Sequence, residues 1–216
     1  MYSQEEIDKI HVLYIHGFEG SGNGPSSQLL QKVLGDEYYV MAPKLDLLDF
    51  EWTIDKIKLF AFAADFIVAS SFGCFYAMMI KDKNKILINP ALPNDLVRNS
   101  LIDNADELNT KLDEFLKVPL SLQDKDETYF AFGLQDDLVN NKDWAKEYYS
   151  EARIFTCDMG HKLDKEGARL VLSIINFIKG GLKIQKNNAD SKSLTDEQIM
   201  KVINEKREVL DWLADK

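Results

Sequence analysis

The sequence is poor in the residues that build disulfide scaffolds. Its 216 residues include two cysteines, Cys74 and Cys157, and three histidines. Two thiols are too few for the disulfide framework of a secreted domain, and both lie in segments that we expect to be buried. We therefore expect two free thiols in the core of a protein of the reducing cytoplasm.

Long apolar runs and an apolar leader are also missing. No apolar run approaches the roughly 20 residues that a membrane-spanning helix needs. Residues 1–9 hold three acids and none of the apolar segment of a secretory signal. These observations predict a soluble, cytoplasmic chain that has no membrane partner.

Positive charge is scarce as well. Lys and Arg number 26 against 36 Asp and Glu, which gives a formal net charge of −10 and a pI near 4.8. Nucleic acids and anionic membrane surfaces bind clustered Lys and Arg, so this balance argues against both kinds of partner. The remaining composition, with 45% hydrophobic residues, is that of an ordinary globular protein of one domain.

What the sequence does contain is a regular alternation of short apolar runs with segments of helical spacing. The expected strands are His11–Ile15, Tyr38–Ala42, Phe66–Val68, Lys85–Ile88, Thr128–Phe132 and Arg153–Thr156. The expected helices are Ser27–Leu34, Thr53–Ala64, Cys74–Ile80, Lys142–Tyr149 and Lys165–Ile178. This order predicts an α/β fold class, a three-layer α/β/α sandwich around a mostly parallel, doubly wound sheet.

The main domain is expected to span residues 1–182, with one interruption. Residues 93–127 are acidic and supply no obvious strand. We expect an insertion there with short helices around Leu101 and around Leu112, which could form a small cap.

Beyond the last strand, Gly180 and Gly181 should end the final helix of the domain. Residues 183–193 have the composition of a polar linker. Residues 194–216 then predict an amphipathic C-terminal helix that begins with a capping box and carries an apolar stripe. We expect this helix to pack on its own domain or on a second subunit, as in a homodimer. A tail that recruits another protein is the less favoured alternative.

The segment D-F-I-V-A-S-S-F-G-C-F-Y predicts a strand that turns sharply into a helix, with serine at the apex. This nucleophile elbow needs small residues two positions on either side of the serine, so that neighbouring backbones can approach. Centring the pattern on Ser71 places Ala69 and Gly73 at those positions. Centring it on Ser70 would place the larger Val68 and Phe72 there, so Ser71 is the candidate nucleophile.

A serine nucleophile needs a general base, usually a histidine oriented by a carboxylate. His11 begins a strand and is best explained as a structural or surface residue. His161 follows the last expected strand in M-G-H-K and is the candidate base. Of the adjacent acids that follow the fifth strand, Asp136 fits G-x-x-D-x-x-V and is the candidate orienting acid. Asp137 is the reserve.

The last expected part of the catalytic site is an oxyanion hole, which stabilises the negatively charged oxygen of a tetrahedral intermediate. We expect it to be formed by the backbone N–H groups of Phe72, directly after the serine, and Phe18, in the loop after the first strand. Gly17 lets that loop come close, and His16 should shape the loop without acting as a base.

Five short motifs follow the expected strands in chain order. They are H-G-F after the first strand, A-S-S-F-G at the elbow, I-N-P-A after the fourth strand, G-L-Q-D-D after the fifth and G-H after the sixth. Residues 10–180 therefore resemble the α/β-hydrolases, and most of all the small bacterial esterases of the YqiA type. The resemblance implies an α/β-hydrolase fold and hydrolysis of a small ester substrate by Ser71, Asp136 and His161, without metal or cofactor.

Several other functions are less well supported by the sequence. Asp136, Asp137, Asp158 and His161 lack the histidine spacing of a zinc site, and G-S-G-N-G at residues 20–24 lacks the Lys-Ser/Thr of a phosphate-binding loop. Two alternatives stay open. One is a thioesterase with the same triad, and the other is a catalytically idle fold used as a binding or scaffold protein.

Overall fold

The computed structural model describes residues 8–149 and 153–188, which contain one sheet of six parallel strands. The strands are β1 (Ile10–Ile15), β2 (Tyr38–Met41), β3 (Phe66–Ser70), β4 (Asn84–Ile88), β5 (Thr128–Gly133) and β6 (Ile154–Cys157). They lie in the order β2-β1-β3-β4-β5-β6, and every neighbouring pair is parallel.

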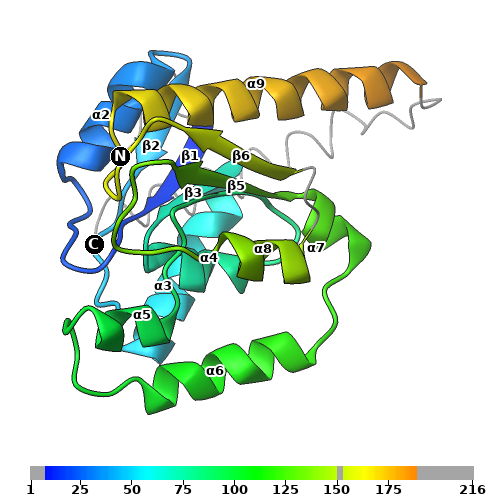
Figure 1. The fold of residues 1–216 in the computed structure, drawn as a ribbon. Helices are drawn as coiled ribbons and strands as arrows, with labels where there is room; N and C mark the ends of the chain where they lie inside the picture. The colour runs from blue at the N-terminus through cyan, green and yellow to red at the C-terminus, as the bar shows by residue number, and fades with distance from the viewer. Residues whose placement is uncertain (1–7, 150–152, 189–216) are drawn as a thin grey trace.

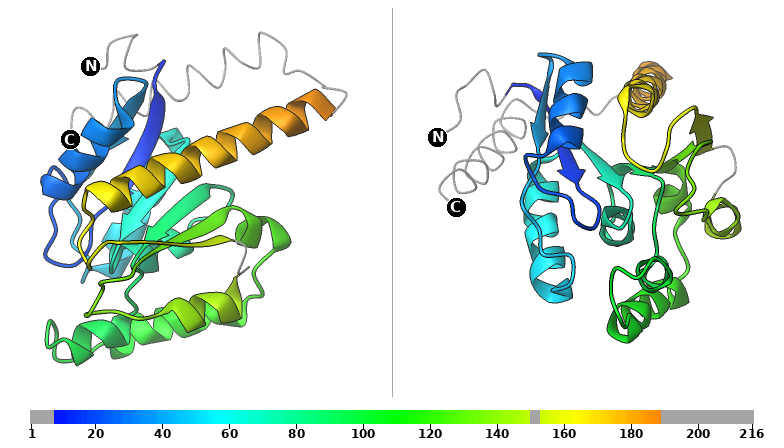
Figure 2. Two further views of the ribbon diagram at one scale, coloured as in Figure 1. Left: turned by 45° about the horizontal axis from the view of Figure 1, so that its top comes forward. Right: turned by 60° about the vertical axis from the view of Figure 1, so that its left-hand side comes forward.

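Helices cover both faces of the sheet (Figure 1). Helices α2 (Pro25–Leu34) and α9 (Lys165–Asn188) lie on one face, and α3 (Phe50–Ala63), α4 (Gly73–Met78) and α8 (Lys142–Tyr148) lie on the other. Alternate residues of β1 show the two layers: Leu13 and Ile15 belong to one apolar cluster, and Val12 and Tyr14 to the other. Figure 2 shows the same layers from two further sides. The predicted three-layer α/β/α fold is confirmed.

The strand order reverses between β1 and β3. The chain passes outward from β1 to β2 and then returns to the other side of β1 to form β3. In doubly wound sheets, ligands bind beyond the carboxyl ends of the strands at this switch point. The loop that begins at His16 and the turn at Ser71 leave the sheet there.

The insertion contains three helices, α5 (Pro93–Arg98), α6 (Asp106–Lys117) and α7 (Leu122–Asp126). The helix predicted around Leu112 is present as α6, but the prediction of a helix around Leu101 is wrong. Leu101 lies just beyond α5, which ends in a Schellman motif: Ser100 has φ 56°, and the N–H of Leu101 donates to Leu96 O at 2.8 Å. Leu101 thus supplies the apolar residue of a helix stop.

Helix α6 packs below α3, away from the α9 layer (Figure 1). Its Leu108 and Leu112 are buried in the same apolar cluster as Phe50 of α3, and Lys111 pairs with Glu51 at 2.7 Å. None of the residues 93–127 lines the cleft that contains Ser71.

Helix α9 is longer than predicted. We expected it to stop at Ile178 before Gly180 and Gly181, yet its backbone continues to Asn188. A glycine inside a helix costs about 1 kcal/mol, which is not enough to end a helix already anchored by tertiary packing. Residues 183–188 of the predicted linker are therefore helical, whereas residues 189–193 and the predicted C-terminal helix at 194–216 lie outside the described residues.

Cys74 and Cys157 are both free, as predicted, but they differ in burial. Cys74 is fully buried in α4. Cys157 was expected to be buried and is partly exposed, because it ends β6, the strand at the edge of the sheet. None of the helices in the described part of the chain is long and apolar enough to span a membrane.

Candidate active site

Ser71 occupies a strained turn between β3 and α4. Its φ of 52° lies in the left-handed region, which a residue with a side chain rarely adopts. The turn is held from both sides, since Ser71 N–H donates to Ile88 O at 2.8 Å and Cys74 N–H donates to Ser71 O at 3.0 Å. Strain of this kind is characteristic of functional sites.

The small residues of the elbow let the turn pack against the end of β1. A Cβ on Gly73 would lie 2.4 Å from His16 O and 2.6 Å from Ile15 O, so glycine is required there. Ala69 is fully buried at the other small position. Its methyl group is accommodated, so the alanine does not disturb the elbow.

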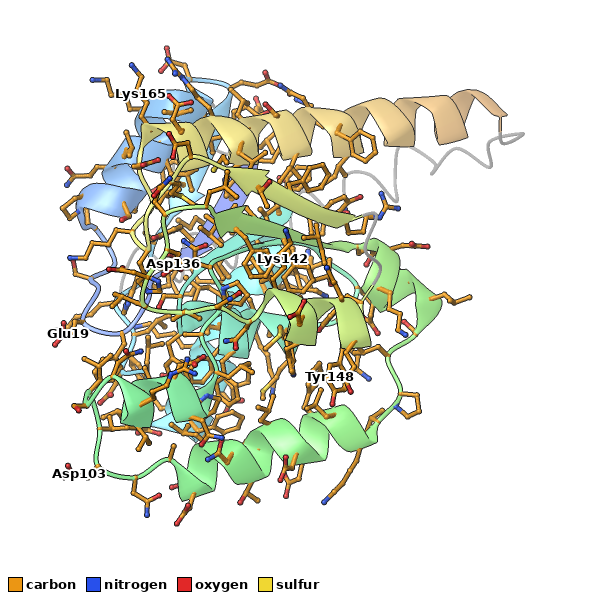
Figure 3. The ribbon with its side chains drawn as sticks, in the orientation of Figure 1. Glu19, Asp103, Asp136, Lys142, Tyr148 and Lys165 are labelled. Atoms are coloured by element: carbon orange, nitrogen blue, oxygen red, sulfur yellow. The ribbon has the colours of Figure 1, made fainter. Side chains whose placement is uncertain are left out.

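The three predicted side chains meet at the carboxyl ends of β3, β5 and β6. His161 Nε2 lies 2.9 Å from Ser71 Oγ, and His161 Nδ1 lies 2.9 Å from Asp136 Oδ2. Asp136 belongs to the loop that follows β5, at the same side of the molecule as Glu19 in the loop after β1 (Figure 3). Residues far apart in the sequence thus form one continuous chain of hydrogen bonds.

The surroundings of Asp136 keep its carboxylate ionised and fixed. Burial alone would raise the pKa of Asp136, but hydrogen bonds from His161 and from the N–H groups of Val139 and Leu138 outweigh burial and lower the pKa. Those amides donate to Oδ1 at 3.1 and 2.9 Å, which leaves Oδ2 for His161. An ionised carboxylate only accepts hydrogen bonds, so His161 carries its proton on Nδ1 and accepts from Ser71 at Nε2.

Asp137, the reserve acid, points elsewhere. It is exposed, while the side chain of Asp136 is only 3% exposed. The structure therefore places Asp136, and not its neighbour, against His161.

Two backbone N–H groups lie in the segments that meet at Ser71, those of Phe18 and Phe72. Within residues 8–149 and 153–188, the amides of Phe18 and Phe72 donate to no protein acceptor. Gly17 lies directly against Ser71, which keeps the loop of Phe18 beside the elbow. Both amides therefore lack a protein acceptor among the described residues, which is what an oxyanion hole requires of its donors.

His16 is a structural residue of that loop. Its Nδ1–H donates to Gly17 O at 2.9 Å, and its Nε2 accepts from the N–H of Leu45 at 3.2 Å. Burial lowers the pKa of His16, so the ring stays neutral. Both nitrogens are engaged, and His16 is therefore not positioned to act as a base.

A cleft of about 300 Å³ opens around Ser71 and His161. Its walls combine the loop after β1 with hydroxyl-bearing residues, among them Tyr14, Ser26 and Ser70. A second cleft of about 590 Å³ is lined by the same loop and shares His16, Phe18, Glu19 and Gly20 with the first. A third, of about 490 Å³, lies between α2 and β2 and includes neither Ser71 nor His161.

In the described part of the chain, no group of three or more His, Cys, Asp and Glu side chains is arranged to hold a metal ion. The side chains of Asp136, His161 and Ser71 are instead hydrogen-bonded to one another, as acid, base and hydroxyl.

The sequence analysis missed Asn89, which lies directly behind this site. It is fully enclosed, with 1% exposure, and its side chain contacts the loops of both Asp136 and His161. The available signal was I-N-P-A, an asparagine between a buried strand and a proline. That pattern was interpreted as the end of a strand and as one motif of the resemblance, and the asparagine itself was given no role.

Comparison with solved structures shows the same fold in known enzymes. Est1E from Butyrivibrio proteoclasticus, solved with ferulic acid bound, is 14% identical with a TM-score of 0.54, covering 82% of this chain and 91% of its own. An alpha/beta hydrolase enzyme from the metagenome of Mar Chica lagoon sediments in Morocco is 14% identical with a TM-score of 0.51, covering 83% and 92%.

The thioesterase domain from the curacin biosynthetic pathway is also similar, at 17% identity and a TM-score of 0.50, covering 78% of this chain and 92% of its own. The sequence matches no protein-family model and no curated protein. At such identities these likenesses establish the fold: the chain has the architecture of α/β-hydrolase structures.

Proposed function

We propose that this protein is a serine hydrolase that cleaves small carboxylic esters through an acyl-enzyme intermediate. The observation that carries the proposal is the hydrogen-bonded chain from Ser71 through His161 to Asp136, with 2.9 Å at each step. A serine bonded to a neutral histidine, itself oriented by a buried carboxylate, is an activated nucleophile.

In the proposed reaction, Ser71 Oγ attacks the carbonyl carbon of the ester while His161 Nε2 takes the hydroxyl proton. Asp136 stabilises the imidazolium that forms. The developing oxyanion accepts hydrogen bonds from the N–H groups of Phe18 and Phe72. The imidazolium then gives its proton to the departing alcohol, which leaves an acyl group on Ser71. Water activated by the same histidine releases the acid.

The cleft supports a small substrate. Its volume of about 300 Å³ lies at the low end of the range for small-molecule sites. The resemblance of residues 10–180 to YqiA-type esterases favours esters over other acyl compounds. A thioester would react by the same steps, and relative turnover of matched oxygen and sulfur esters separates the two substrate classes. We propose that the protein acts in the cytoplasm without a nucleic-acid or membrane partner.

A fluorophosphonate probe tests the proposal without knowledge of the natural substrate. The probe reacts with an activated serine, and its adduct resembles the tetrahedral intermediate, so labelling requires nucleophile, base and oxyanion donors together. We expect one adduct, mapped to Ser71 by peptide mass spectrometry. Ser71→Ala and His161→Ala should each suppress labelling.

The adjacent serine provides the matched control. Ser70 is buried and lines the same cleft, but no hydrogen bond connects it to His161 among the described residues. Ser70→Ala should therefore still be labelled at Ser71. Folded wild-type protein that forms no adduct would favour the binding or scaffold alternative.

A further inference from the structure

The turn after β4 touches all the loops that carry the proposed catalytic residues. Ile88 O accepts the N–H of Ser71 at 2.8 Å, and Ala91 N–H donates to Ser71 O at 3.2 Å. At the far end of the acid loop, Asn141 Nδ2 donates to Pro90 O at 2.9 Å. This turn is thus bonded to the nucleophile elbow on one side and to the loop of Asp136 on the other.

The side chain of Asn89 extends these contacts to the histidine loop. Its Nδ2 donates to Gly160 O at 2.9 Å and to His161 O at 3.1 Å. Its Oδ1 accepts the N–H of Gly133, at the end of β5, at 2.7 Å. The amide therefore uses both of its N–H groups and its oxygen on backbone atoms of the two loops.

These contacts fix the backbone on both sides of the His161 Cα. The carbonyl of Gly160 belongs to the peptide before that atom, and the carbonyl of His161 belongs to the peptide after it. Because peptides are planar, holding both carbonyls restricts the two dihedral angles between them. The direction in which the imidazole leaves the backbone is restricted with them.

The third contact links the acid to the base. Gly133 begins the loop that presents Asp136, and a Cβ on Gly133 would lie 2.2 Å from Met159 O. The acid and histidine loops therefore approach backbone to backbone beside Asn89. One buried amide is therefore bonded to the backbone of both the strand end before Asp136 and the loop of His161.

Asparagine suits this position for two further reasons. Its φ is 44°, in the left-handed region that asparagine tolerates better than most residues with a side chain. It is 1% exposed, so water cannot readily replace the three contacts. An aspartate would keep the acceptor but lack both donors.

We propose that Asn89 is a positioning residue for the reaction: its amide holds His161, and the loop of Asp136, at the distances that proton transfer requires. The inference rests on the proposed function. It assigns Asn89 no contact with the substrate. Its loss should therefore lower the rate of the chemical step more than it weakens binding of the ester.

The test measures kcat and KM for a short-chain activated ester, together with thermal unfolding. Asn89→Gly keeps the left-handed backbone accessible and removes the amide. Asn89→Asp keeps the acceptor for Gly133 and removes both donors. We expect kcat to fall about a hundredfold in each variant, because small displacements of catalytic groups have effects of this size. KM should change little.

Gln31 is the matched control. Its amide also makes three backbone hydrogen bonds, to Gly35 O, Tyr38 O and Val40 N–H, but at the β2 edge of the sheet. Gln31→Ala should lower thermal stability and leave kcat unchanged. An equal loss of kcat in this variant would attribute the effect to general destabilisation and overturn the inference.

The variants also separate this inference from the function on which it rests. If wild-type turnover does not depend on Ser71, the proposed function fails and the role of Asn89 fails with it. If the wild type is active and Asn89→Asp retains its kcat, the role of Asn89 alone is overturned. The kinetics of both variants are compared with the wild type at equal folded fraction, so that either folded variant decides the question.

Discussion

Gly17 and Ser71 lie so close together that no side chain fits between them. A Cβ on Gly17 would come within 2.8 Å of Ser71 Cβ and 3.4 Å of its Oγ. Ser70 O lies 3.2 Å from the same point, so backbone also blocks the space. The loop after β1 can therefore bring the amide of Phe18 to the elbow only because residue 17 has no side chain.

We predict that Gly17→Ala lowers ester turnover and leaves the fold intact. The methyl group must push the loop away from Ser71, which withdraws the Phe18 N–H from the oxyanion. Loss of one such donor costs about 10²-fold or more in kcat. Steady-state kinetics and fluorophosphonate labelling measure the effect.

Gly180 of α9 is the control for this glycine substitution. No atom lies within 4 Å of a Cβ built there, so Gly180→Ala should keep full activity. It should also stabilise α9 by up to about 1 kcal/mol, since alanine has the higher helix propensity. Wild-type turnover in Gly17→Ala would show that the loop can move without loss of the oxyanion donor.

Substitutions of the adjacent acids Asp136 and Asp137 should have very different effects on ester turnover. Asp136→Asn removes the ionised acceptor that holds the proton of His161 on Nδ1, and a loss of roughly 10⁴ in kcat is expected for such a change. Asp137 is exposed and does not contact His161, so Asp137→Asn should stay near wild type. Kinetics of the two variants at equal folded fraction provide the comparison. A larger loss in Asp137→Asn would contradict the geometry.

The fold could be predicted from the sequence because its central strands, β1, β3, β4 and β5, are buried on both faces. Residues such as Phe66–Val68 must be apolar throughout, and the small residues around Ser71 are required by backbone contacts. The juxtaposition of Ser71, Asp136 and His161 followed from their places after β3, β5 and β6, because the carboxyl ends of parallel strands lie at one edge of the sheet.

What the sequence left undetermined depends on tertiary contacts. Asn89 looks like an ordinary strand end, and its partners lie 44 to 72 residues away. Gly180 looks like a helix stop, but packing of α9 on the sheet outweighs its low propensity. Helix α3 begins at Phe50, before the predicted Thr53, because the side chain of Asp49 caps it at Trp52 N–H.

Buried His16 should make stability depend on pH. Its pKa is lowered from the ordinary 6.5 by burial, so as pH falls the unfolded chain takes up a proton before the folded chain does. Because the unfolded state then binds more protons, the free energy of unfolding should fall as pH drops below about 6.5. The decrease should end at the lowered pKa of the folded protein.

The variant His16→Gln isolates this contribution. Its side-chain oxygen can accept the N–H of Leu45, but glutamine does not titrate. Urea unfolding of both proteins between about pH 7.5 and pH 5 should give a smaller pH dependence for the variant, with the other titrating groups cancelling in the difference. Parallel curves would mean that His16 gains its proton equally in both states.

Shortening α9 should separate the part that completes the core from the part that does not. Among the residues of this helix up to Gly180, whose burial the structure describes, the last buried apolar ones are Ile174, Ile175 and Ile178. A chain that ends at Gln185 keeps all three, so we expect it to fold and to hydrolyse simple esters like the full chain.

A chain that ends at Ser173 loses their packing on the sheet and should be unfolded, since each buried aliphatic side chain contributes about 2 kcal/mol or more. Circular dichroism and ester turnover of the two truncated proteins give the answer. Unfolded product from the longer chain would show that residues beyond Gln185 are needed to complete the fold.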